Sequence, residues 1–192
     1  MPDLEEHFKF SKEEIEGAAK PDKRACYEFH GGEDAALKRL EEYVFEKRAV
    51  AHYNDTRNNL IGANYSSKLA PWLANGSLSA RKIYHETKKF EVKYKRNEST
   101  QVFLDELFWR DFMRFWCANH GMKVFHEYGI YNRTYYNWQT SKETVRRWRE
   151  GQTGMPIIDA LMREMNETGF MPNRGRMVVA CYFAMDLKQD WR

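Results

Sequence analysis

The chain has 192 residues and a formal net charge of +3, and 42% of its residues are hydrophobic and 15% aromatic. This length fits one ordinary domain or part of a larger one, and the apolar content is enough for a buried core. The small net charge does not by itself indicate a polyanionic partner. No apolar run approaches the length of a membrane span, and residues 1–20 lack the hydrophobic region of a signal peptide.

The three cysteines, Cys26, Cys117 and Cys181, are far apart in the sequence and form no Cys-x-x-Cys pair. This pattern argues against a disulfide framework and against a zinc site. We therefore expect reduced cysteines in the protein core, an intracellular reducing compartment and no metal centre.

Residues 1–32 mix charge runs with isolated aromatic side chains and show no sustained period. They are expected to form a lead-in segment, with one helical domain over 33–192. The first predicted helix covers 34–48, with apolar residues at helical spacing and Asp34 as its N-cap. The polar stretch 53–64 that follows is predicted to be a loop.

Residues 65–76 place Ser66, Ser67 and Lys68 before a short helix that Pro71 begins and Gly76 ends. Two hydroxyls, an ammonium group and the free amides of a helix start together suit a phosphate group. Serines in this position are also ordinary helix caps. The residues alone leave both interpretations open.

Ser79 is expected to cap a helix that runs to about Phe90, followed by a charged connector. The longest helical pattern covers 99–119, and its wide apolar stripe should face the core. The members of this stripe are Phe103, Leu104, Leu107, Phe108, Phe112, Phe115 and Trp116. A second face carries Glu106, Trp109, Arg110 and Met113. That face could be a half-buried salt bridge beside a packed indole, or the wall of a cavity that stacks an aromatic ring.

Three further helices are predicted. Thr140 and Glu143 form a capping box for residues 140–150, and the next helix runs from Pro156 to Gly169. The last covers 173–187 and should be buried over its apolar part, 178–185. Helices joined by short loops, without strand alternation, predict an all-α domain.

The stretch 168–177 combines an amide, two guanidinium groups, an aromatic ring and a thioether. Arg174 and Arg176 are two residues apart, so they point to different sides of a helix. This spacing suggests a boundary between two binding surfaces. The alternative is a solvated, basic helix start.

These landmarks resemble the FAD-binding helical domain of the photolyase/cryptochrome family, most closely its DASH-type cryptochromes. Six motifs occur in family order between about Tyr27 and Arg192: Phe29-His-Gly-Gly-Glu-Asp-Ala-Ala-Leu37, Tyr53-Asn-Asp-Thr-Arg-Asn58, Tyr65-Ser-Ser-Lys-Leu69 with Pro71-Trp72, Glu106-Leu-Phe-Trp-Arg-Asp111, Gly151-Gln-Thr-Gly154 with Pro156, and Thr168 to Arg176. The expected fold is therefore a partial photolyase/cryptochrome FAD-binding helical bundle. The resemblance implies that the N-terminal antenna domain with its pigment site, and the C-terminal part of the helical domain, lie outside these 192 residues.

The resemblance also implies site residues. The FAD diphosphate and its surroundings would be contacted by Tyr53, Ser66, Ser67, Lys68 and Leu69. The flavin and adenine would be lined by Phe103, Arg110, Phe170, Asn173 and Arg176. A flipped-out pyrimidine dimer would meet the catalytic set Glu106, Trp109, Asn173 and Met177, with Arg57 and Arg174 as further DNA contacts. Trp138 and Trp191 resemble the outer and middle tryptophans of the electron-transfer chain of the family.

The implied function is light-driven, FAD-dependent repair of cyclobutane pyrimidine dimers in single-stranded or looped DNA, as a fragment or truncated member of a DASH-type protein. One alternative is a blue-light photoreceptor or nucleic-acid-binding module without repair. A further alternative is that a chain of this length binds no FAD, because it would hold only part of the cofactor cradle. No membrane partner is expected.

Overall fold

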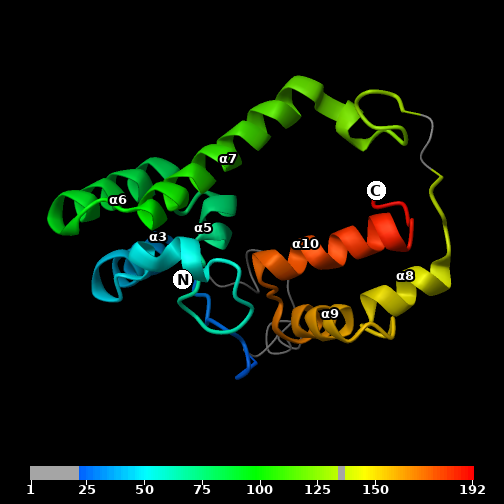
Figure 1. Cartoon of the computed structure of the whole chain (residues 1–192), viewed down its shortest axis with the longest axis horizontal. Coiled ribbons are helices and arrows are strands. Elements are labelled where there is room, and N and C mark those ends of the chain that lie inside the picture. The colour runs from blue at the N-terminus through cyan, green and yellow to red at the C-terminus, as the bar shows by residue number, and fades with distance from the viewer. Residues whose placement is uncertain (1–21, 134–136) are drawn as a thin grey trace, which may run out of the picture.

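The computed structural model describes residues 22–133 and 137–192, and this part of the chain is helical without strands. The all-α prediction is thus confirmed for the described residues. The first 21 residues of the predicted lead-in segment lie outside them. The elements are α3 (Glu33–Glu41), the π-helix η1 (Glu42–Glu46), the 3-10 helix η2 (Ala49–His52), α4 (Tyr53–Thr56), α5 (Ala70–Asn75), α6 (Ala80–Tyr94), α7 (Glu98–His120), the 3-10 helix η3 (Gly121–Phe125), α8 (Lys142–Arg149), α9 (Pro156–Thr168), α10 (Asn173–Cys181) and the π-helix η4 (Tyr182–Asp186) (Figure 1).

Helices α3 to α6 and the first half of α7 pack around one aromatic-rich core. Its buried members are Ala36, Leu40, Tyr43, Val44, Val50, Leu69, Trp72, Leu78, Ile83, Phe90 and Phe103. The tryptophan of this core is held by its indole N–H, which donates to the carbonyl of His30 at 2.9 Å. The segment before α3 is therefore tied to the core of the first helices.

Three predictions in this region are wrong in detail. The N-cap of α3 is Gly32, and Asp34 lies in the first helical turn, where its charge favours the helix N-terminus. The α-helix also ends at Glu41 and continues as a π-helix, because the backbone shifts to wider hydrogen bonds such as Lys47 N–H to Glu42 O. The predicted loop 53–64 begins with four helical residues, α4.

The residues predicted to mark the starts of α5, α6 and α9 and the ends of α5 and α9 are confirmed. Proline lies in the first turn of α5, and Gly76 ends that helix in the left-handed region at φ 82°. The Ser79 hydroxyl accepts from the Arg81 N–H and caps α6, which extends four residues beyond the predicted end. Helix α9 runs from Pro156 to Thr168 with Gly169 as its C-cap.

Helix α7 departs most from its prediction. Phe103 and Leu104 are buried, but Phe108, Phe112 and Phe115 are more than half exposed. Figure 1 shows the reason: the second half of α7 extends beyond α6 and beyond the other helices of the first core. The predicted apolar stripe is present, but no other segment of the described residues covers its second half.

The cysteine prediction is also wrong with respect to burial. All three thiols are free, but Cys117 and Cys181 are exposed and Cys26 is half-buried. Cys117 lies on the uncovered half of α7, and Cys181 ends α10 on its outward side. Helix position explains their exposure.

Helices α8, α9 and α10 form a second, smaller core of Ile158, Leu161, Met162, Met171 and Val179. The turn between α8 and α9 is fixed by a carboxylate, since Asp159 accepts from the Thr153 N–H, the Thr153 hydroxyl and the Gly154 N–H. Burial opposes ionisation of Asp159, but these hydrogen bonds lower its pKa overall. The turn also requires Gly151, because φ is 63° and a Cβ there would lie 2.7 Å from the Asp159 carbonyl.

Two helix predictions in this second half need correction. The N-cap of α8 is Ser141, whose hydroxyl accepts from the Thr144 N–H, so the predicted capping box starts one residue too early. In the predicted buried stretch 178–185, Val179 and Phe183 are buried, whereas Met185 is 72% exposed. One face of α10 and η4 is covered by α9, and the other is not.

Candidate functional site

The predicted phosphate-binding residues form one short loop before α5. Ser66 and Ser67 are half-buried, while the side chains of Lys68 and Leu69 are buried. Leu69 belongs to the first core, so any ligand contact from it comes through its backbone. The Ser67 hydroxyl accepts from the Leu69 N–H at 3.4 Å. The Ser67 hydroxyl thus closes a local turn, but the N-cap of α5 is Leu69 and this helix has no side-chain cap, so the cap interpretation of these serines is wrong.

Lys68 has an unusual setting for a lysine. Its Nζ lies 3.1 Å from the centre of the Tyr65 ring and 5.0 Å from that of Phe170, and it donates to the Ser66 hydroxyl at 3.2 Å. Burial lowers the pKa of Lys68 to about 8, and no ion pair within the described residues holds its charge. The site thus contains a desolvated ammonium group next to two hydroxyls.

Sequence reasoning missed Arg39, which is fully buried beneath this loop and donates to it. A signal existed in the sequence, because Arg39 shares a helical face with the apolar residues Ala36, Leu40 and Tyr43. A charged side chain on a core-facing stripe needs polar partners in the interior. Here the loop 63–67 supplies them.

The other residues predicted around the flavin do not come together in one cavity. Tyr53 and Phe103 contact each other edge to face at 5.1 Å, and both pack in or against the first core. Arg110 donates to Asp111 and to the Leu73 carbonyl at 3.3 Å. The Arg176 Nε donates to the Met171 carbonyl at 3.0 Å, on the side of α10 away from Arg174. Their roles remain predictions.

Residues predicted to contact DNA form a connected row across α4, α7 and α10. Arg57, just after α4, makes an ion pair with Glu106 of α7. The neighbouring Asn58 accepts from Arg174 of α10 at 2.8 Å. Arg174 also approaches the Met177 sulfur at 3.8 Å. Segments far apart in the sequence are thus joined on one surface.

Three further residues belong to this row. Asn173 approaches the Met177 sulfur at 4.0 Å. Trp109 follows Glu106 by one turn of α7, is 56% exposed, and packs edge-on against Phe112. Burial raises the pKa of Tyr53 to about 12, and the Glu106 carboxylate acts in the same direction. A phenol and a paired carboxylate therefore lie close together, and the exposed indole follows the carboxylate by one turn of α7.

The two predicted electron-transfer tryptophans lie near the chain segments that meet at the Gln139–Gln189 bridge. The Trp138 indole donates to the Glu127 carbonyl at 3.0 Å. Trp191 is about half exposed, with its ring centre 6.0 Å from that of Phe125. Both indoles therefore lie toward the surface, and their role is not tested by this arrangement.

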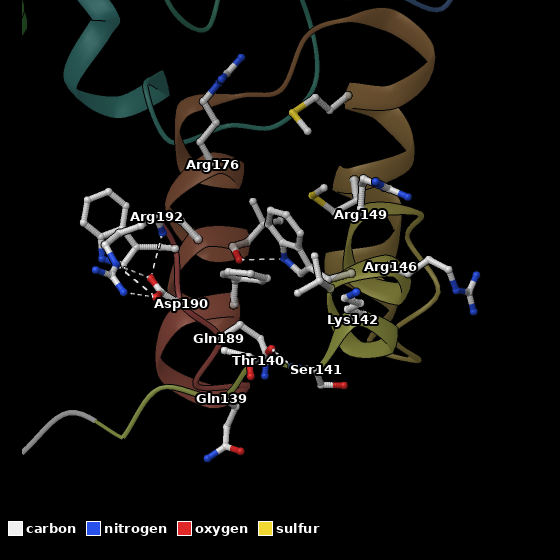
Figure 2. A pocket seen from close by; sticks show the side chains of 18 of the residues that line it. Gln139, Thr140, Ser141, Lys142, Arg146, Arg149, Arg176, Gln189, Asp190 and Arg192 are labelled. Carbon is white, nitrogen blue, oxygen red and sulfur yellow. Dashed lines mark hydrogen bonds and ion pairs between the residues drawn. The ribbon is translucent and has the colours of Figure 1, made fainter. Parts of the chain in front are cut away.

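A cavity of ≈ 940 Å³ opens between α8, α9 and α10. Figure 2 shows one end of this cavity, where the Gln189 side chain accepts from the Ser141 N–H at 3.0 Å, Gln139 points away, and the Asp190–Arg192 ion pair lies nearby. Its floor is apolar, with the Trp148 ring 4.5 Å from Phe183 and the indole donating to the Val179 carbonyl. Only Arg176 of the predicted ligand-binding residues lines this space.

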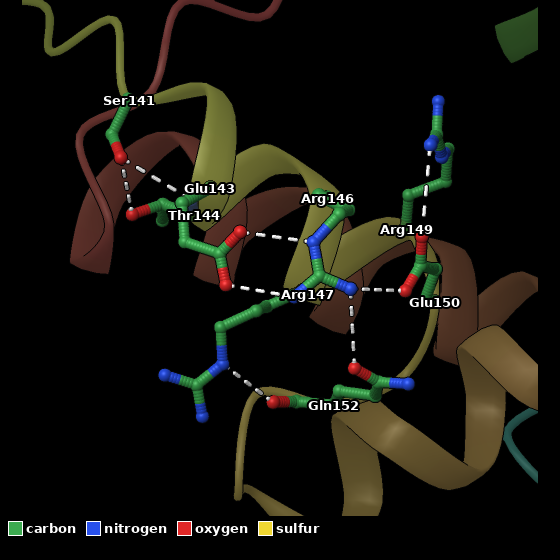
Figure 3. Close-up of polar contacts among 8 residues, drawn as sticks. All are labelled: Ser141, Glu143, Thr144, Arg146, Arg147, Arg149, Glu150 and Gln152. Atoms are coloured by element: carbon green, nitrogen blue, oxygen red, sulfur yellow. Dashed lines mark hydrogen bonds and ion pairs between the residues drawn. The ribbon is translucent and has the colours of Figure 1, made fainter.

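Helix α8 beside the cavity is basic, but its charges are partly paired. Figure 3 shows Arg146 held between Glu143 and Glu150 with Gln152 beside it, and Arg147 donating to the Gln152 carbonyl at 2.9 Å. Exposed pairs of this kind contribute little stability. Helix α8 is therefore a solvated, internally paired surface and not a free basic patch.

Two negative findings apply to residues 22–133 and 137–192. No group of three or more histidine, cysteine, aspartate or glutamate side chains is arranged to hold a metal ion. None of the helices in this part of the chain has the length and apolarity needed to span a membrane.

Comparison with known proteins bears directly on this site. Residues 103–192 match the model of the FAD binding domain of DNA photolyase. Cryptochrome DASH of Synechocystis is 46% identical over 171 residues, which are 89% of this chain and 35% of that protein. The chain spans about a third of the length of the curated relatives it matches.

Comparison with solved structures gives the same result as the sequence comparison. The Synechocystis cryptochrome superimposes with a TM-score of 0.88 at 46% identity, over 90% of this chain and 36% of that one. An archaeal photolyase from Sulfolobus tokodaii, solved with two FAD molecules, gives a TM-score of 0.60 at 30% identity, over 81% of this chain and 32% of that one. The resemblance predicted from the motifs is thereby confirmed. The chain belongs to the photolyase/cryptochrome family, whose cofactor is FAD, and is most like its DASH-type cryptochromes.

Proposed function

We propose that this chain binds FAD through its helical domain and holds the cofactor's diphosphate at residues 66–69. The observation that carries the proposal is the donor set of this loop. The N–H groups of Ser67 and Lys68 have no acceptor within the described residues, and two hydroxyls and a buried ammonium lie beside them. Such donors fit a diphosphate, because charge-assisted hydrogen bonds are strongest where the cation is desolvated.

Bound FAD supplies light-driven electron transfer, and the protein supplies binding, orientation and electrostatics. The residues of this chain act on the ligands. Lys68 and the loop amides hold negative charge, and Phe170 lies close enough to Lys68 to keep water from one side of it. The Arg57–Glu106 ion pair orients the carboxylate.

We further propose that the row Arg57, Glu106, Trp109, Arg174 and Met177 receives a flipped-out cyclobutane pyrimidine dimer from single-stranded DNA, which a DASH-type protein repairs in light. The exposed Trp109 offers a stacking surface, and Glu106 offers a polar edge one turn away. Arg57, paired with Glu106, and Arg174, bonded to the neighbouring Asn58, would serve as phosphate contacts.

The binding part is tested with a short oligonucleotide that carries one thymine dimer and with the undamaged oligonucleotide. Trp109→Ala should weaken binding of the damaged strand about tenfold, since base stacking on an aromatic side chain is worth about 1–3 kcal/mol. Phe115→Ala is the matched control, because Phe115 is an exposed aromatic residue on the same helix. Equal losses in both variants, or no loss in either, would contradict the dimer pocket.

The repair part is tested by illuminating the flavin-loaded protein with the same damaged strand. Repair predicts that the dimer disappears in light and persists in the dark. A protein that retains flavin and binds the strand, yet leaves the dimer intact, favours the alternative of a photoreceptor or nucleic-acid-binding module.

A further inference from the structure

We propose that Arg39 is a positioning residue for the loop 66–69, which turns the loop's backbone amides toward the bound anion. This inference rests on the proposed FAD function, because it explains how the same loop is held. Arg39 is 0% exposed and lies beneath the loop, so it touches no ligand itself.

Every N–H of the Arg39 guanidinium has an acceptor. The Nε donates to the Ser67 carbonyl at 2.9 Å. One terminal nitrogen donates to Glu42 at 2.9 Å and to Asn64 at 3.1 Å. The other donates to the carbonyls of Ala63 at 2.8 Å and Ser66 at 3.4 Å. Since a guanidinium has five N–H groups, its hydrogen-bonding capacity is fully used.

The geometry of the peptide bond turns these contacts into an orientation. In a planar trans peptide, the carbonyl of one residue and the N–H of the next point in opposite directions. The carbonyls of Ser66 and Ser67 point to Arg39, so the N–H groups of Ser67 and Lys68 point away from it. Both amides lack an acceptor within the described residues, as does the N–H of Ser66.

The backbone after these carbonyls has the form of an anion-binding concavity. Lys68 has φ 61°, in the left-handed region, and Leu69 follows in the right-handed helical region. Successive residues of opposite hand bring their N–H groups to one side, and such nests bind anions. Of these groups the Lys68 N–H has no acceptor within the described residues, whereas the Leu69 N–H donates to the Ser67 hydroxyl. A left-handed lysine is unfavourable by itself, so it persists because its surroundings hold it there. Arg39 supplies that hold.

Arg39 is itself fixed from both sides. Its guanidinium lies 4.6 Å from the centre of the Tyr27 ring and 5.5 Å from that of Tyr43, and Glu42 balances its charge. A lysine has three donors and no planar fork, so it cannot hold the carbonyls of Ala63, Ser66 and Ser67 together with Glu42. A lysine in place of Arg39 would therefore keep the positive charge without holding the loop 66–69 in position.

The test compares the wild-type chain with Arg39→Lys and with Arg48→Lys, an exposed arginine that follows η1. Backbone amide NMR of the protein without ligand reports the mobility of residues 64–69 against α6. Titration with inorganic pyrophosphate reports anion binding. Arg39→Lys should make residues 64–69 mobile on the picosecond to nanosecond scale and weaken pyrophosphate binding by about tenfold, because preorganisation is lost. Arg48→Lys should change neither quantity.

Asn64→Ala guards against a folding defect, since it removes one acceptor of Arg39 from a half-buried loop position. Asn64→Ala should also increase the mobility of residues 64–69 and weaken pyrophosphate binding, but by less than Arg39→Lys does. A loop that stays rigid, or pyrophosphate affinity that is unchanged, in a folded Arg39→Lys protein overturns the proposal and leaves the FAD function standing. A loop that loosens while even the wild-type chain ignores pyrophosphate supports the role of Arg39 and contradicts the diphosphate site.

Discussion

The two halves of α7 carry the same kind of apolar stripe and have opposite surroundings. In the first half, which packs against α4, α6 and the 3-10 helix η2, Phe103 and Leu104 are buried. In the second half, Phe108, Phe112 and Phe115 are more than half exposed. Periodicity therefore reports which face of a helix is apolar, but not whether a partner covers it. Exposed apolar rows of this kind mark places where other surfaces bind.

The largest expected effect lies in the covered half. Leu104 is 1% exposed, so Leu104→Ala should lower the free energy of unfolding by about 2–5 kcal/mol through lost burial and a cavity. Urea unfolding followed by circular dichroism measures this change. A loss below about 1 kcal/mol would mean that this half of α7 is not packed as described.

The buried ammonium group of Lys68 should make the free energy of unfolding depend on pH. The pKa of Lys68 is lowered by burial from 10.5 to about 8, so in this interval the unfolded chain binds more protons than the folded one. The free energy of unfolding should therefore rise with pH from about 8 to 10. Above about 10 the trend should reverse, since burial raises the pKa of Tyr53 to about 12 and the unfolded tyrosines ionise first.

Cys26, Glu164 and Arg39 also lie near Lys68, and burial raises the pKa of Cys26, which acts in the opposite direction. The measurement is therefore best made in a Cys26→Ser background. Lys68→Met should abolish the rise. A rise that persists in Lys68→Met would assign it to another group.

A smaller effect is expected at the start of α7. The Asn97 side chain accepts from the Thr100 N–H at 2.9 Å, and the Thr100 hydroxyl accepts from the Asn97 N–H at 3.2 Å. Asn97→Ala should cost about 1 kcal/mol of stability, because it removes this cap. Differential scanning calorimetry can detect this, with the solvated side chain of Arg96 changed to alanine as the control.

The smallest effect on stability is expected in the uncovered half. Phe112→Ala should change the free energy of unfolding by no more than about 0.5 kcal/mol, since the ring is 53% exposed. The same change should reduce self-association in sedimentation experiments, because apolar surface is removed. A loss as large as that of Leu104→Ala would show that the second half is covered in solution.

Much of the fold follows from local signals. Pro71, Ser79, Pro156 and Gly169 predict helix ends correctly, because capping and left-handed turns depend on residues close in sequence. Exposure of Phe112 or of Cys117 could not be predicted in this way, since it depends on which segments are present to cover them.

The candidate site likewise has features that depend on residues close in sequence and one feature that depends on residues far apart. The loop Ser66–Leu69 and the different directions of Arg174 and Arg176 follow from the sequence, and the contacts of these arginines confirm that they face apart. Arg39 was missed because three of its five partners are backbone carbonyls 24 to 28 residues away, which no side-chain motif encodes. Only tertiary structure shows why an arginine belongs on an apolar stripe.

The central claim is that residues 66–69 hold the FAD diphosphate, and flavin retention tests it most directly. The purified 192-residue chain is mixed with FAD and passed through gel filtration, beside a Ser66→Ala/Ser67→Ala variant. Flavin absorbance should elute with the wild-type protein and be strongly reduced with the variant, while both remain folded. Equal flavin in the two proteins, or none with a folded wild-type chain, would contradict it.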